Sequence, residues 1–130
     1  MGLHSATEPE FEAPLATTFD VLSWEVELAA ARCIQLDATI GEMMKAIPED
    51  RQADFMEAMH TVDLLSQQLT GLSAFARQMS GSVSSEASAP VGAALGDITL
   101  SALADRMSAA LGGEEKGIND SEEAGDLDLF

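Results

Sequence analysis

Apolar residues recur at helical spacing over residues 16–47 of the sequence. Their steps alternate between three and four without a break, through Phe19, Leu22, Val26, Ala29, Cys33, Leu36, Ile40, Met43 and Ile47. This spacing places them on one face and predicts a long amphipathic helix, which Thr17 or Thr18 can cap. Because Cys33 falls inside the apolar stripe, we interpret it as a small buried residue rather than a catalytic nucleophile.

A second apolar stripe follows over residues 49–80. Its members are Phe55, Met59, Val62, Leu65, Leu69, Leu72, Ala76 and Met79, with one irregular step near Leu65. Pro48 separates the two stripes, and proline disfavours helical geometry at the residue before it while suiting the first turn of a new helix. The pattern therefore predicts a tight turn near residues 47–49 that joins two long antiparallel helices.

The rest of the chain divides into four segments by composition. Residues 1–15 have two prolines and no Lys or Arg, and we interpret them as a mobile leader. Residues 81–96 are rich in Ser, Ala and Gly, which is typical of a flexible linker. Within residues 97–113 we expect a short amphipathic helix at 97–111. Asp97 or Thr99 can cap its start, and two glycines end it. Residues 114–130 form an acidic tail that we expect to be disordered alone.

Composition supports an all-α fold. Tyr is absent and aromatic residues make up 5% of the chain, whereas Ala and Met are abundant.

Two long helices bury only part of their apolar surface against each other. We therefore favour a homodimer in which two hairpins form a four-helix bundle. The alternative is a monomeric three-helix bundle that uses residues 97–111.

Charge and residue counts exclude several classes of protein. The formal net charge is −17, which disfavours nucleic acid and anionic membranes as partners, because both need a basic face. A single cysteine permits no internal disulfide, and His4 lies far from His60 in the chain, so we expect no metal site. No apolar run approaches the roughly 18 residues of a membrane helix, and no signal peptide is visible. The expected compartment is the cytoplasm.

The second helix carries the candidate chemistry on a polar stripe beside its apolar face. The stripe consists of Met56, His60, Asp63, Gln67 and Gly71. Asp63 and Gln67 are one helical turn apart, so their side chains point the same way. The plainer interpretation of the two residues is a solvated pair on the helix surface.

Three features together resemble the CheZ family of chemotaxis phosphatases, including the short alphaproteobacterial group called CheT. The sequence Asp63-Leu64-Leu65-Ser66-Gln67 lies midway along the second helix of the hairpin, a linker follows, and the chain ends in an acidic segment with apolar residues. In that family an Asp-x-x-x-Gln pair lies on a hairpin that dimerises into a four-helix bundle. A tethered acidic segment captures the response regulator CheY. The corresponding residues here are Asp126, Leu127, Asp128, Leu129 and Phe130.

The resemblance implies hydrolysis of an aspartyl phosphate on a CheY-type response regulator. The partner would supply its own Mg²⁺, and this chain would bind no cofactor of its own. Gln67 would position the attacking water, and Asp63 would pair with the active-site lysine of the receiver. Two other functions remain open: a non-catalytic adaptor that binds a regulator or another chemotaxis protein through the bundle and tail, and an acidic helical assembly protein.

Overall fold

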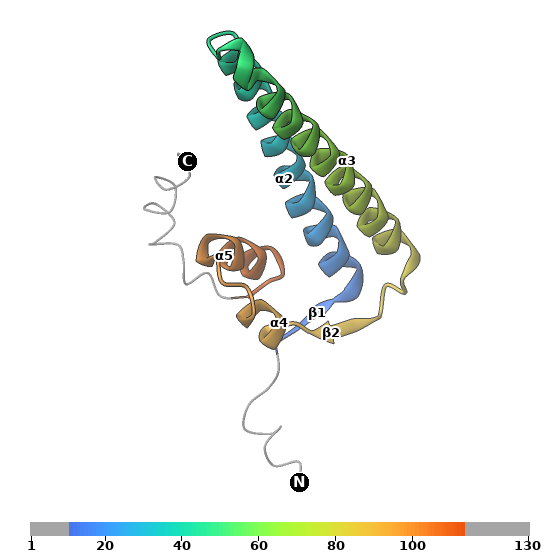
Figure 1. Ribbon diagram of the computed structural model, residues 1–130. Coiled ribbons are helices and arrows are strands. Elements are labelled where there is room, and N and C mark those ends of the chain that lie inside the picture. Colours follow the sequence, from blue (N-terminus) through green and yellow to red (C-terminus); the bar gives the residue numbers. More distant parts are fainter. Residues whose placement is uncertain (1–10, 114–130) are drawn as a thin grey trace. The chain divides into compact units, whose positions relative to one another are not determined.

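The computed structural model describes residues 11–113, and these residues are mostly helical (Figure 1). Two long helices, α2 (Leu15–Met44) and α3 (Gln52–Ser82), form an antiparallel hairpin. The predicted all-α class and the predicted long hairpin are therefore confirmed.

The turn between the two long helices begins earlier than predicted. Helix α2 ends at Met44 rather than Ile47. The backbone N–H groups of Lys45, Ala46 and Ile47 each donate to the carbonyl three residues earlier, at 3.0–3.3 Å. These tighter bonds satisfy the last carbonyls of the helix before Pro48, where helical geometry cannot continue. A 3₁₀ turn, η1 (Glu49–Arg51), then leads into α3.

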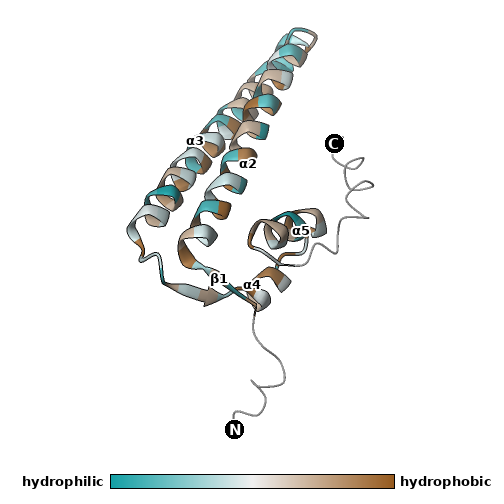
Figure 2. Cartoon of the chain, turned by 180° about the vertical axis from the view of Figure 1, so that it is seen from behind, coloured by the Kyte–Doolittle hydropathy of each residue, from teal (hydrophilic) through white to brown (hydrophobic). Residues whose placement is uncertain are grey.

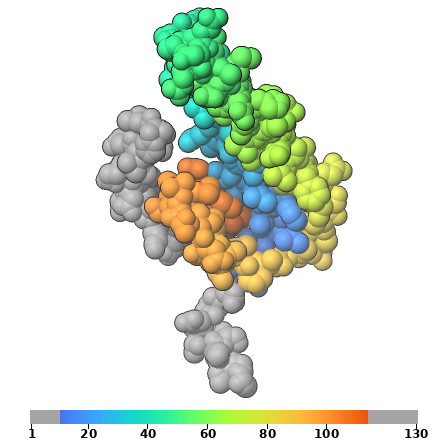
Figure 3. Space-filling view, in the orientation of Figure 1, coloured from blue at the N-terminus to red at the C-terminus, as the bar shows by residue number. Residues whose placement is uncertain are grey.

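The two helices contact each other along a seam that differs from the predicted stripes. We assign to the seam the buried and half-buried positions that recur at steps of three and four: Ser23, Val26, Ala30, Cys33, Asp37, Ile40, Met44 and Ile47 on α2 and the turn after it, and Gln52, Phe55, Met59, Val62, Ser66, Leu69, Ser73 and Ala76 on α3. Glu25, Leu28, Ala29 and Gly41 of α2 are half-buried outside this set. Both sets alternate in steps of three and four, so the irregular step near Leu65 disappears. Hydrophobic and hydrophilic residues are interspersed along both helices (Figure 2), and the space-filling view shows the turn between them at the tip of the hairpin (Figure 3).

Several predicted core residues are therefore not in the seam. The exposed fractions are 42% for Leu22, 50% for Leu36 and 49% for Met43 on α2, and 44% for Leu65 and 56% for Leu72 on α3. The buried positions next to them are small, with Ser23 at 1%, Ala30 at 3%, Ser66 at 8% and Ser73 at 3% exposure. Within one chain these residues lie beside the seam rather than in it, because close helix packing selects the smallest side chains; the dimer for which the stripe was proposed stays a prediction.

Two segments predicted to lack regular structure pair with each other instead. Strand β1 (Glu12–Pro14), in the predicted leader, pairs antiparallel with β2 (Ser88–Pro90), in the predicted linker. The backbone N–H of Leu15 donates to Ala87 at 2.8 Å, and that of Val91 donates to Phe11 at 2.8 Å. The pairing corrects both predictions for the residues concerned.

A small apolar cluster surrounds this two-stranded ladder. Ala13, Val91 and Leu111 are buried, and Phe11, Val21 and Leu95 pack against them. Burial of these apolar groups stabilises a pair of strands that would be marginal alone.

The predicted third helix at 97–111 corresponds to the shorter α5 (Ser101–Ala110), whereas α4 (Gly92–Gly96) is an additional short helix within the predicted linker, which it corrects for these residues. Leu100 stands at the N-cap of α5 and makes no side-chain capping bond, so neither Asp97 nor Thr99 is the cap. The predicted end of the helix is confirmed at Gly112, whose φ of +95° is a conformation that favours glycine.

The described residues divide into two compact units. The ladder unit contains residues 11–21 and 80–113, and the hairpin unit contains Leu22–Met79. Within the ladder unit, the Ser80 hydroxyl donates to the carbonyl of Ala16 at 2.9 Å. The predicted site residues Asp63 and Gln67 belong to the hairpin unit.

Candidate functional site

Asp63 and Gln67 lie on the surface of α3, as predicted. Both residues are exposed. The Gln67 Nε2 amide donates to Asp63 Oδ2 at 2.9 Å. A carboxylate and an amide one turn apart on a helix commonly make this bond. It leaves the amide with a second N–H donor and a carbonyl acceptor.

The neighbours of this pair on the predicted polar stripe are also exposed. Met56 is 60% exposed, and His60 and Gly71 face solvent. A Cβ placed at Gly71 would have no atom within 4 Å, so no close backbone approach requires glycine there. The interpretation of this stripe as the solvent edge of α3 is confirmed.

An ion pair joins the two helices on the same edge of the hairpin. Arg77 Nη2 donates to Glu27 Oε1 at 2.8 Å, and both side chains are 55% exposed. Arg77 lies 14 residues, or two heptads, after Asp63, and therefore on the same face of α3. Sequence reasoning missed this pair because its members are fifty residues apart.

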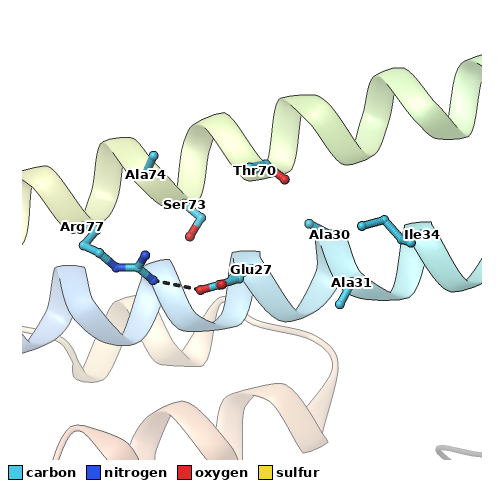
Figure 4. Close-up of a pocket in the computed structure, with 8 residues that line it drawn as sticks. All are labelled: Glu27, Ala30, Ala31, Ile34, Thr70, Ser73, Ala74 and Arg77. Atoms are coloured by element: carbon cyan, nitrogen blue, oxygen red, sulfur yellow. Dashed lines mark hydrogen bonds and ion pairs between the residues drawn. The ribbon is translucent and has the colours of Figure 1, made fainter.

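A shallow groove of about 300 Å³ opens between the helices beside the ion pair (Figure 4). Its lining consists of Glu27, Ala30, Ala31, Ile34, Thr70, Ser73, Ala74 and Arg77. Small side chains create the hollow, and the Glu27–Arg77 ion pair lies at one end of it. Thr70 is three residues after Gln67, so the groove begins one turn along α3 from the candidate pair. We call the edge with Asp63, Gln67 and this groove the polar edge.

Within residues 11–113, no three His, Cys, Asp or Glu side chains gather where they could hold a metal ion. No helix in this range is both long enough and apolar enough to span a membrane. The predicted partner-binding residues Asp126, Leu127, Asp128, Leu129 and Phe130 lie outside the described residues.

Comparison with known proteins places the chain in a family. The sequence model of a family described as "Domain of unknown function (DUF8776)" matches residues 11–130. The chain belongs to this family. The match includes β1, the hairpin, β2 and the C-terminal segment, so the family domain contains both units. No curated protein gave a significant match, and no solved structure did so either.

Proposed function

We propose that this chain stimulates dephosphorylation of a CheY-type response regulator in chemotaxis signalling, in the cytoplasm, as its resemblance to the CheZ family implies. The observation that best supports the proposal is the exposed Asp63–Gln67 pair, which is hydrogen-bonded at 2.9 Å on a long helix. A helix surface that presents a carboxylate and an amide can approach the phosphorylated site of a folded partner.

Gln67 would orient the attacking water. A neutral amide both donates and accepts hydrogen bonds, so it can hold a water in line with phosphorus without repelling the phosphoryl group. The water oxygen forms a bond to phosphorus, the aspartyl O–P bond breaks, and inorganic phosphate and the free carboxylate result. Mg²⁺ would be bound by the partner, and this chain would contribute no cofactor.

Asp63 would serve two purposes at once. Its Oδ2 already accepts the amide N–H of Gln67, which fixes the orientation of that side chain. A carboxylate accepts several hydrogen bonds, so Asp63 can also pair with the active-site lysine of the receiver. This pairing would hold α3 in register with the phosphorylated aspartate.

The groove at the polar edge supports a docking role for the same face. It lies one turn from Gln67, and its ion pair joins the two helices beside it. An apolar side chain of the receiver could occupy the hollow between Ile34 and Thr70. Docking there would restrict the approach of the receiver and hold Gln67 near the reacting phosphorus.

The acidic C-terminal segment would capture the receiver. Leu127, Leu129 and Phe130 would supply apolar contacts, and Asp126 and Asp128 would supply charge. A tethered segment raises the effective concentration of its partner to the millimolar range. We expect removal of residues 120–130, or the single change Phe130→Ala, to weaken binding of phosphorylated receiver in calorimetric titrations. Equal affinities for the wild type and both variants would contradict this role.

The decisive experiment for catalysis measures phosphate release from a phosphorylated CheY-type receiver. We expect Gln67→Ala to lower the stimulated rate about 10- to 100-fold, because the water loses its positioning group. Gln68→Ala is the matched control, since Gln68 is also exposed on α3 but lies off the polar edge. Helix content and receiver binding should match the wild type in both variants.

Two results would contradict the phosphatase proposal. If wild-type protein binds the receiver without accelerating phosphate release, the chain is a non-catalytic adaptor. If Gln67→Ala, Asp63→Ala and Gln68→Ala all match the wild type, the pair is only solvated surface. The proposal also includes a homodimer of two hairpins, and the mass of the wild type in solution tests that part separately.

A further inference from the structure

Asp37 of α2 carries a carboxylate that the packing of the hairpin does not explain. The residue is half-buried, and its Oδ1 atom is buried without a hydrogen-bond partner within the described part of the chain. A buried carboxylate oxygen without a partner costs free energy, so an aspartate at this position lowers stability. Residues that lower stability in this way are commonly kept because they serve a functional site.

The groove shows which residues of α3 lie beside Asp37. Ala30 of α2 and Thr70 of α3 line this groove together. Asp37 lies seven residues after Ala30, and Asp63 lies seven residues before Thr70. Because the two helices are antiparallel, one heptad forward on α2 and one heptad back on α3 lead to the same level and the same face of the hairpin. Asp37 and Asp63 are therefore neighbours across the seam.

A contact nearer the tip of the hairpin gives the same alignment. A Cβ placed at Gly41 of α2 would lie 3.9 Å from the Cε atom of Met59 on α3. Gly41 lies four residues after Asp37, and Met59 lies four residues before Asp63. Four residues are about one helical turn, so Asp37 and Asp63 lie one turn along both helices from a pair in contact. The half-buried carboxylate of Asp37 thus lies next to the exposed carboxylate of Asp63.

The charges of these two carboxylates are not compensated within the described hairpin. Asp63 accepts a hydrogen bond from the neutral amide of Gln67 at 2.9 Å. The ion pairs of the hairpin join other residues: Glu27 to Arg77, Glu42 to Lys45 and Asp54 to Arg51. A partly buried charge is screened less than an exposed one, so the charge of Asp37 adds to the negative potential at Asp63. The pair of carboxylates therefore favours the approach of a cation.

We infer that Asp37 is a positioning residue of the candidate site, and that it acts through Asp63 on the cation that this site receives. The inference rests on the proposed function, in which the cation is the ammonium group of the receiver lysine. Asp37 repels the Asp63 carboxylate towards solvent and adds negative charge behind it. The lysine is then held more strongly than a single exposed carboxylate would hold it. Gln67 keeps its role, because Asp37 does not touch the phosphoryl group.

The variant Asp37→Asn removes the charge and keeps the size of the side chain. We expect the affinity for a receiver that carries beryllofluoride in place of phosphate to fall about three- to tenfold in calorimetric titrations. The receiver concentration that gives half-maximal phosphate release should rise by the same factor. The rate at saturating receiver should stay within about twofold of the wild type, since Gln67 still orients the water.

Glu57→Gln is the matched control for the loss of one negative charge. Glu57 is exposed on α3, six residues before Asp63 and therefore on another face of the helix. Its replacement should leave the affinity for the receiver unchanged. An equal loss of affinity in Glu57→Gln and Asp37→Asn would mean that only the net charge of the chain matters, and it would overturn the inference.

Salt and stability separate this role from a structural one. Because the effect is electrostatic, the difference in affinity between the wild type and Asp37→Asn should shrink as NaCl is raised from 0.05 to 0.5 M. Asp37→Leu should lose as much affinity as Asp37→Asn while it unfolds at a higher temperature than the wild type. If both variants bind more weakly and also unfold at a lower temperature, the carboxylate serves the fold and the inference is wrong.

A measurement without the receiver distinguishes this inference from the phosphatase proposal. The side-chain amide signals of Gln67 in nuclear magnetic resonance spectra report on its bond to Asp63, and they should shift in Asp37→Asn but not in Glu57→Gln. Unchanged signals in Asp37→Asn overturn the inference, whether or not phosphate release is stimulated. Equal receiver affinities for the wild type and Asp37→Asn, with a wild type that accelerates phosphate release, overturn the inference alone. A wild type that binds the receiver more tightly than Asp37→Asn without accelerating release supports the inference and contradicts the phosphatase proposal.

Discussion

Ser23 and Ser73 join the two long helices by hydrogen bonds at a point of close approach. Each hydroxyl donates to the backbone carbonyl of the other residue at 2.9 Å, and the two oxygens are 3.0 Å apart. A side chain that bonds to the backbone of the facing helix requires an unusually short distance between the helices. Serine satisfies its own polar group in this space, whereas a larger residue at Ser23, which is 1% exposed and does not line the groove, has no room.

Ser23→Leu should therefore destabilise the hairpin, although it adds apolar surface to a buried site. We expect a loss of about 1–3 kcal/mol in the free energy of unfolding, because the extra atoms force the helices apart. Ser23→Ala should cost less, about 0.5–1.5 kcal/mol, since the hydroxyl of Ser73 keeps its backbone acceptor. Urea denaturation followed by circular dichroism measures both values. Equal stability of the Leu variant and the wild type would contradict the close approach.

Asp37 carries a buried oxygen without a partner. Its Oδ1 atom has no hydrogen-bond partner within the described part of the chain, and the residue is half-buried. An unsatisfied buried polar atom costs free energy. Asp37→Leu should raise the free energy of unfolding by about 1–3 kcal/mol.

Asp20→Leu is the matched control for Asp37→Leu. Asp20 is an exposed residue of the same helix, so its replacement should change stability by less than about 0.5 kcal/mol. Thermal unfolding of the two variants beside the wild type makes the comparison. A lower melting temperature for Asp37→Leu would show that the carboxylate serves the fold.

At the scale of elements, the hairpin could be predicted and its seam only in part. Val26, Cys33 and Ile40 were placed correctly, since they belong to both the apolar stripe and the seam. Leu36 and Leu65 were not. Hydrophobicity alone cannot tell which of two adjacent stripes meets the other helix, because that choice depends on how closely the backbones approach.

The strand ladder could not be predicted from local sequence. Each strand has three residues, ends in proline, and is too short to show alternation. Proline is acceptable there because each strand has only one neighbour and its other side needs no donor. The ladder exists because residues 11–21 and 80–113 bury a shared apolar cluster, which is a non-local cause.

The candidate site was predicted at the level of single residues. The exposure of Asp63 and Gln67 follows from helical spacing, which is a local property. The Glu27–Arg77 pair and the groove depend on the register between the two helices. That register is not a local property, so the sequence pattern alone does not predict it. Arg77 is the only Lys or Arg of α3, and its spacing of two heptads from Asp63 was the available signal.

The glycine that ends α5 tests the local geometry of the ladder unit. Gly112 has a φ of +95°, so Gly112→Ala should destabilise the unit by about 1 kcal/mol or more. Gly96→Ala is the control, because Gly96 lies within α4 and a Cβ there meets nothing within 4 Å. Hydrogen exchange of the Val91 amide, which donates to Phe11 across the ladder, reports on this unit. Faster exchange in Gly96→Ala than in Gly112→Ala would contradict the prediction.

At the scale of the whole molecule, charge is the dominant property. The chain has 23 acidic and 6 basic residues, and its net charge of −17 is large for 130 residues. The surface ion pairs described here are exposed, including Lys45–Glu42 and Arg51–Asp54, so each offsets little of the repulsion. A dimer would bring two such chains together against their mutual electrostatic repulsion.

Added salt should therefore stabilise this protein. Self-repulsion destabilises a compact state of high net charge, and ions screen it once the Debye length falls from about 30 Å at 0.01 M to about 3 Å at 1 M. We expect the melting temperature to rise between 0.01 and 0.5 M NaCl. The increase should be larger than in sucrose solutions of equal osmolarity, because sucrose does not screen charge. A melting temperature that falls with NaCl would mean that attractive ion pairs such as Glu27–Arg77 outweigh the repulsion. In that case the charged surface would raise the melting temperature on balance rather than lower it.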